Sequence, residues 1–162
     1  MRVLGIDPGT AATGYGIVET RNGRPGRGGD FGQLIECGVI TFARRSPLPL
    51  RLAELYAGIV DIIRRHHPDA LALENAFYHK NVRTTLVLGH ARGVVLLAAQ
   101  QARLDIAEYS PATIKKTVVG AGGAAKSQVA AMVARLLQLR AAPKPSDAAD
   151  GVAVALTHIL RL

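Results

Sequence analysis

The sequence has little of what stabilises a small secreted fold. It contains a single cysteine, Cys37, so an intrachain disulfide framework is excluded and a reducing compartment is expected. Its 162 residues can bury a core without a disulfide or a structural metal. We therefore expect a single domain over residues 1–162.

Long apolar runs are also missing. No uninterrupted apolar run reaches the roughly 18 residues that a membrane span needs, and the chain starts directly with a strand-like segment rather than with a signal-peptide pattern. The sequence therefore predicts a soluble cytoplasmic protein without a membrane partner.

Negative charge is scarce as well. The chain has 20 Lys and Arg against 12 Asp and Glu, a formal net charge of +8. Such an excess is typical of proteins that bind polyanions, because neutralised phosphates release their counterions. A solubility role or a ribosome-associated basic domain would give the same composition. The charge therefore favours nucleic-acid binding but does not by itself distinguish it from these alternatives.

The hydrophobic pattern predicts a mixed α/β fold. Three strands over 2–7, 14–19 and about 33–42 should form an antiparallel meander, with a Gly- and Arg-rich surface loop at 21–30. Helices and strands should then alternate, because periodic and short apolar runs alternate there. The later elements are expected as helices at 50–67, 82–103, 111 onward, 127–139 and 147 onward, and as strands at 70–74 and 106–109.

Four of the few acids stand at the ends of predicted elements. Asp7 and Glu74 each end an apolar strand, and Asp147 and Asp150 share a face at the start of the last helix. If the first and fourth strands are neighbours, all four carboxylates could converge, and two Mg²⁺ ions would offset their repulsion and support phosphodiester hydrolysis. The competing interpretations are a turn role for Asp7 and a helix-dipole role for the last pair.

Six sequence blocks, taken in order, resemble the RuvC family of Holliday-junction resolvases, the crossover junction endodeoxyribonucleases. The resemblance runs nearly end to end. Its blocks are Leu4-Gly-Ile-Asp-Pro-Gly-Thr10 with Gly14-Tyr-Gly16, Glu74 with Phe77 and Lys80-Asn81, Leu88-Gly-His-Ala-Arg-Gly93, Lys115 with Thr117-Val-Val-Gly120, Lys126-Ser-Gln-Val129, and Asp147-Ala-Ala-Asp150.

The resemblance implies a ribonuclease-H-like fold, a homodimer and symmetric nicking of four-way DNA junctions in recombination and repair. It also implies dependence on Mg²⁺ or Mn²⁺, with two ions per subunit, and a branch-migration complex of RuvA and RuvB as partner. By position, Asp7, Glu74, Asp147 and Asp150 match the catalytic, metal-binding acids of the family. Two departures are the long 21–30 loop and Gly151, where an alanine is more usual.

Three further positions match DNA-contacting residues of the family. Phe77 would stack on an unpaired base, with a core position as the alternative. Lys115 and Lys126 would lie near the DNA backbone and the active centre, with simple solvated charge as the alternative. No histidine is expected to bind a metal, and His158 is interpreted as packing.

Gly89 and Gly93 lie one turn apart in an otherwise apolar predicted helix. Small residues so spaced let another helix approach, and a two-fold contact between two copies is a common use of such a face. Packing against the sheet of the same chain is the alternative.

Three other functions compete with a metal-dependent junction endonuclease. A non-catalytic junction-binding module would keep the basic surface but would not need four placed acids. A ribonuclease-H-like nuclease acting on RNA would share the first block only. An actin-like ATPase would need two such domains, and 162 residues provide one.

Overall fold

The first three strands form the predicted antiparallel meander. They are β1 (Arg2–Asp7), β2 (Ala12–Glu19) and β3 (Gln33–Thr41), and Asp7 pairs with Gly14 across β1 and β2. β2 begins two residues earlier than expected. This computed structural model describes residues 1–20, 31–43, 45–75 and 81–162, so the expected 21–30 loop lies outside it.

Two parallel strands extend the meander into a five-stranded sheet. They are β4 (Ala70–Glu74) and β5 (Asp105–Tyr109), and the strand order is β3-β2-β1-β4-β5. β4 lies beside β1 and runs parallel to it. The condition set by the sequence analysis, that the first and fourth strands be neighbours, is therefore met, and Asp7 and Glu74 end adjacent strands at the same end of the sheet.

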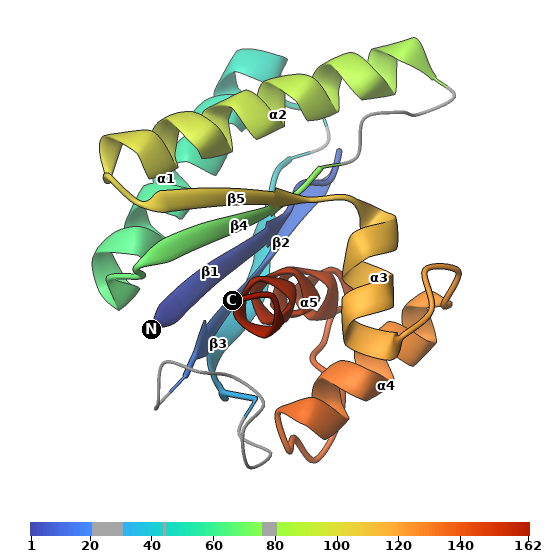
Figure 1. Ribbon diagram of the computed structural model, residues 1–162. Coiled ribbons are helices and arrows are strands. Elements are labelled where there is room, and N and C mark those ends of the chain that lie inside the picture. The colour runs from blue at the N-terminus through green and yellow to red at the C-terminus, as the bar shows by residue number, and fades with distance from the viewer. Residues whose placement is uncertain (21–30, 44, 76–80) are drawn as a thin grey trace.

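Two helices cover one face of the sheet (Figure 1). They are α1 (Leu48–His66) and α2 (Val82–Gln101). The apolar stripe of α1, centred on Leu55 and Ile59, packs with Leu4 and Ile17 of the strands, as the 3.6-residue periodicity predicts. α1 begins two residues before the predicted start.

Three helices cover the opposite face (Figure 1). They are α3 (Pro111–Val119), α4 (Lys126–Leu136) and α5 (Ser146–Leu160). Ser110 caps α3 as predicted, its hydroxyl accepting a hydrogen bond from the Thr113 amide at 3.1 Å. α5 packs across β1 and β2 and is buried along most of its length.

α2 is the least buried of the long helices. Its length and a mean hydropathy of 1.3 would suffice for a membrane span by composition alone, and only 22% of that window is buried. The helix nevertheless contains Arg83 and Arg92, and its residues Val95 and Ala98 pack into the core beside α1. A helix of a water-soluble domain meets the same criterion.

Candidate nuclease site

Asp7 and Glu74 form a pair of largely buried carboxylates at the ends of β1 and β4. Burial, followed by the charges of Glu74, Asp150 and Asp147, raises the pKa of Asp7 from its ordinary 3.8 to about 8 against the opposing effect of Lys126. Burial and then Asp150 raise the pKa of Glu74 as well. These carboxylates are therefore close enough to resist each other's ionisation.

Asp150 reaches the pair from the start of α5. Lys126, the first residue of α4, donates a hydrogen bond from Nζ to Asp150 Oδ2 at 2.7 Å. The Asp150 side chain is 15% exposed, whereas that of Lys126 is 71% exposed. The hydrogen bond to Asp150 raises the pKa of Lys126, so the lysine keeps its positive charge beside the acids.

A hollow of about 140 Å³ joins these acids to two lysines. We call it the lysine-side hollow, and it is lined by Asp7, Glu74, Pro111, Ile114, Lys115, Lys126, Val129, Asp150 and Ala153. The structure thus brings Lys115 and Lys126 to the acids, as the resemblance implied. A hollow with both signs of charge can receive a phosphate on its lysines next to the carboxylates.

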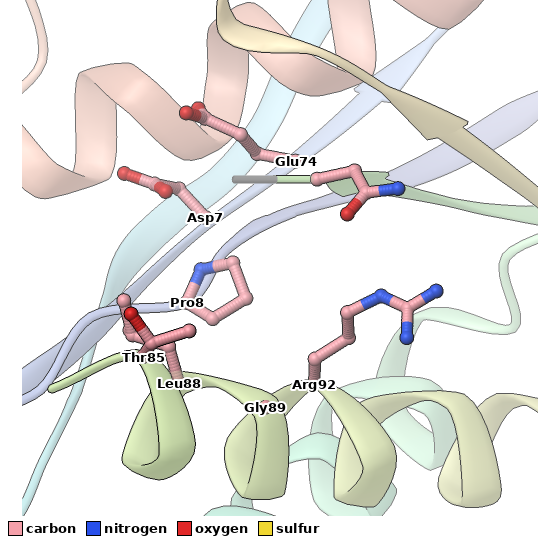
Figure 2. A pocket seen from close by; sticks show the side chains of 8 residues that line it. Asp7, Pro8, Glu74, Thr85, Leu88, Gly89 and Arg92 are labelled. Atoms are coloured by element: carbon pink, nitrogen blue, oxygen red, sulfur yellow. The ribbon is translucent and has the colours of Figure 1, made fainter. Parts of the chain in front are cut away.

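A second hollow of about 170 Å³ lies on the other side of the same two carboxylates. We call it the α2-side hollow, and it is lined by Asp7, Pro8, Glu74, Asn75, Thr85, Leu88, Gly89 and Arg92. Figure 2 shows Thr85, Leu88 and Arg92 of α2 across the hollow from Asp7 and Glu74. Asp7 and Glu74 therefore line both hollows.

The sequence analysis missed the role of Arg92. Its guanidinium makes a two-pronged ion pair with Glu108 of β5, with Nε and Nη2 within 2.9 Å of the carboxylate oxygens. Arg92 belongs to one of the six blocks, which was a usable signal, but Asn75 and Thr85 line the same hollow and carried no local signal. A fixed arginine of this kind holds α2 to the edge of the sheet.

The carboxylates were tested as a metal site. Within the described ranges, no three His, Cys, Asp or Glu side chains are grouped closely enough to enclose an ion, and Asp147 does not line either hollow. The donor set nevertheless fits Mg²⁺, because that ion retains waters and uses only one or two carboxylates together with substrate phosphates. Burial first, and then repulsion from Glu74 and Asp150, raise the pKa of Asp7, and a divalent cation would offset both effects.

The remaining candidates are distributed around the molecule. Phe77 lies outside the described residues, so its stacking role stays a prediction. His158 hydrogen-bonds through Nδ1 with the Tyr109 hydroxyl at 2.8 Å, and Gly151 lies against the backbone of Tyr15.

Gly89 and Gly93 face open space. A Cβ atom added at either position would meet nothing within 4 Å, so the interpretation that they pack inside the chain is wrong. Both line an apolar groove of about 540 Å³ along α2, together with Leu52, Thr85, Leu86, His90, Val94 and Leu97. Leu86 and Leu97 are 58% and 52% exposed, which is unusual for leucines grouped on one face.

Comparison with known proteins gives a consistent match. Residues 3–158 match the family model described as crossover junction endodeoxyribonuclease RuvC. The protein of that name from Desulforamulus reducens is 46% identical over 98% of this chain and 93% of its own, and that from Chloroflexus aurantiacus is 48% identical over 98% and 92%.

Solved structures agree with the sequence comparison. The Thermus thermophilus RuvC structure superposes with a TM-score of 0.88 at 35% identity, covering 99% of this chain and 94% of its own. The structure described as Thermus thermophilus RuvC in complex with Holliday junction substrate has a TM-score of 0.85 at 31% identity over the same shares. The predicted ribonuclease-H-like mixed sheet is confirmed.

Proposed function

Because this chain belongs to the RuvC family of crossover junction endodeoxyribonucleases, we propose that it resolves four-way DNA junctions by hydrolysing one phosphodiester bond in each of two strands. The single observation that carries this proposal is the lysine-side hollow, where Asp7, Glu74 and Asp150 meet Lys115 and Lys126. The biological setting would be recombination and repair of DNA in the cytoplasm, with RuvA and RuvB as partners.

We assign divalent-cation binding to Asp7, Glu74, Asp147 and Asp150, with Mg²⁺ or Mn²⁺ as the ion and two ions per subunit. When bound, such ions lower the pKa of water and stabilise charge on the leaving oxygen. The family is divalent-metal dependent, and the raised pKa of Asp7 supports this assignment, since four acids without a cation oppose each other's charge.

The lysines would hold and orient the DNA strand. Lys115 and Lys126 line the hollow from α3 and α4 and would bind the phosphates that flank the scissile bond. Lys126 is already positioned by its hydrogen bond to Asp150, which keeps its charge next to the acids. Phe77 would stack on a base unpaired at the crossover, so Phe77→Ala should slow cleavage of intact junctions more than cleavage of junctions already nicked at the centre.

The apolar groove of α2 would be the seat of a second copy of this chain. Cutting two symmetry-related strands needs two sites, and an isologous dimer supplies them. The exposed leucines and the open space at Gly89 and Gly93 support a helix of the partner at this face.

The homodimer is tested by Gly89→Leu and Gly93→Leu. The open space beside both glycines predicts that the variants fold, that they sediment as monomers, and that they nick a cruciform plasmid without linearising it in one binding event. A variant that stays dimeric and still linearises the plasmid would place the interface elsewhere.

The junction activity itself is tested with end-labelled four-way junctions, with Mg²⁺ or with EDTA. Paired symmetric cuts that require the metal support the proposal. Junction binding without cleavage would indicate the non-catalytic binding module, and cleavage of RNA-containing substrates alone would indicate the RNA-directed alternative.

A further inference from the structure

α5 lies against β1 and β2 with backbone touching backbone. Four glycines make this possible, and we call them the glycine seam: Gly5, Gly14, Gly16 and Gly151. A Cβ atom added at Gly14 would lie 1.8 Å from the Asp147 carbonyl oxygen, and one at Gly5 would lie 2.3 Å from the carbonyl oxygen of Gly151. No side chain can be fitted between the sheet and the helix at these points.

Gly14 stands where the seam reaches the acids. It pairs directly with Asp7 across β1 and β2, and its α-carbon faces the first turn of α5, which carries Asp147 and Asp150. The depth of this turn therefore sets how far the two acids of the helix stand from the two acids of the strands.

We propose that Gly14 is a positioning residue that holds the first turn of α5 close enough for a small divalent cation and thereby selects Mg²⁺ over the larger Ca²⁺. This inference rests on the proposed function. A Cβ contact shorter than 3.0 Å is essentially never tolerated, so an alanine at position 14 must move the Asp147 carbonyl outward by about 1 Å. Mg²⁺ accepts only near-ideal oxygen distances of about 2.0–2.1 Å, whereas Ca²⁺ accepts about 2.3–2.6 Å in flexible geometry.

Ordinary overpacking would behave differently. An alanine that merely strains a core destabilises by about 1–3 kcal/mol, and this strain does not distinguish one bound cation from another. A change in cation preference is therefore the readout that separates positioning from packing.

The experiment uses Gly14→Ala with Gly58→Ala as its matched control. The Gly58 site lies on α1, on the opposite face of the sheet, where an added Cβ would meet only the Ile40 side chain at 3.0 Å. Binding of Mg²⁺, Mn²⁺ and Ca²⁺ is measured by calorimetry on the full chain with a non-hydrolysable four-way junction, and junction affinity is measured separately in EDTA.

We expect the affinity ratio of Ca²⁺ to Mg²⁺ to rise about tenfold in Gly14→Ala, given the stricter geometry of Mg²⁺. Gly58→Ala should keep the ratio of the unmodified chain, and junction affinity in EDTA should stay within about twofold for both variants, since no phosphate-binding lysine is altered. An unchanged ratio in folded Gly14→Ala overturns the proposal.

A second variant distinguishes unfolding from a change in the position of α5. Val133 is fully buried on α4, in the same core cluster as Val152 of α5, so Gly14→Ala/Val133→Ala opens room into which α5 can move. If circular dichroism shows both variants unfolded, the seam determines folding rather than helix depth, and the proposal is wrong. If the unmodified chain binds none of the three ions, the proposed function fails first, whereas normal binding with an unchanged ratio refutes only the role of Gly14.

Discussion

Two clusters of charged side chains lie in this molecule and are built in opposite ways. Glu36 on β3 accepts hydrogen bonds from the Tyr15 hydroxyl at 2.7 Å and from Arg65 at 2.7 and 3.0 Å, and His66 Nε2 lies 2.9 Å away. These partners, Arg65 above all, lower the pKa of Glu36 to about 2. Asp7 is more deeply buried, yet no described residue donates a hydrogen bond to it, and its pKa rises to about 8.

We interpret the difference as that between a structural carboxylate and a proposed metal-binding one. Partners that satisfy every oxygen of Glu36 make its charge part of the fold. Asp7 accepts no such hydrogen bonds from the described residues, and burial beside other acids disfavours its ionisation. A bound cation, as proposed above, would supply the missing partner. The predictions below test this contrast.

The largest expected effect is on cleavage. Asp7→Asn and Glu74→Gln should each reduce junction cleavage by more than about 100-fold. Mutation of residues that only support metal ligands already lowers metal affinity or activity by about 10- to 100-fold. Junction binding should persist or improve, since a negative charge is removed from the proposed DNA-binding site. Gel assays of cutting and binding measure both.

Glu36→Gln is the control for that effect. It removes a carboxylate that lines neither hollow, and cutting should stay within about twofold of normal, because substitutions away from the site have small effects on it. If Glu36→Gln and Asp7→Asn lose cleavage activity equally, the proposed difference in role between the two clusters is wrong.

The second effect is on stability without metal. The folded-state pKa of Asp7 is raised from 3.8 to about 8, so between these values the folded protein keeps this proton while the unfolded chain loses it, and the stability falls as the pH rises. Asp7→Asn should therefore unfold at a higher temperature than the unmodified chain in EDTA, by roughly 2–4 °C per kcal/mol, with the advantage growing from pH 4 to pH 8. Thermal melts at four pH values would show it, and a pH-independent difference would contradict it.

The smallest effect concerns acid stability. The folded-state pKa of Glu36 is lowered from 4.5 to about 2, so its contribution is present above pH 4.5 and is lost as the pH falls through 2. Glu36→Gln should be less stable than the unmodified chain by about 1 kcal/mol at pH 7 and equally stable near pH 2. Urea melts would detect the convergence of the two unfolding free energies. A difference in unfolding free energy that persists at pH 2 would show that the variant is destabilised by its altered shape rather than by the lost charge.

Local sequence patterns predicted the helices and strands well, because these elements depend on residues that are close together in the sequence. The apolar run ending in Asp7 and the run ending in Glu74 are strands as predicted, and Ser110 caps its helix. Helix ends were displaced by one to three residues, because helix boundaries are the least sharply defined part of a hydrophobic pattern.

Contacts between residues far apart in the sequence could not be predicted from such local patterns. Nothing in the segment around Glu36 indicates that Arg65 and His66 will surround it, because these partners come from a helix about thirty residues later. The exposure of Leu86 and Leu97 was likewise hidden, since an apolar helical run looks the same whether it faces the core or solvent.

The candidate site joins segments that lie far apart in the sequence. Asp7 is on the first strand and Asp150 on the last helix, and both line one hollow. During synthesis the N-terminal strands leave the ribosome first, and without α5 they lack both the helix acids and the core that α5 supplies. A partly made chain therefore cannot assemble the proposed metal-binding site, which is complete only after α5 has docked.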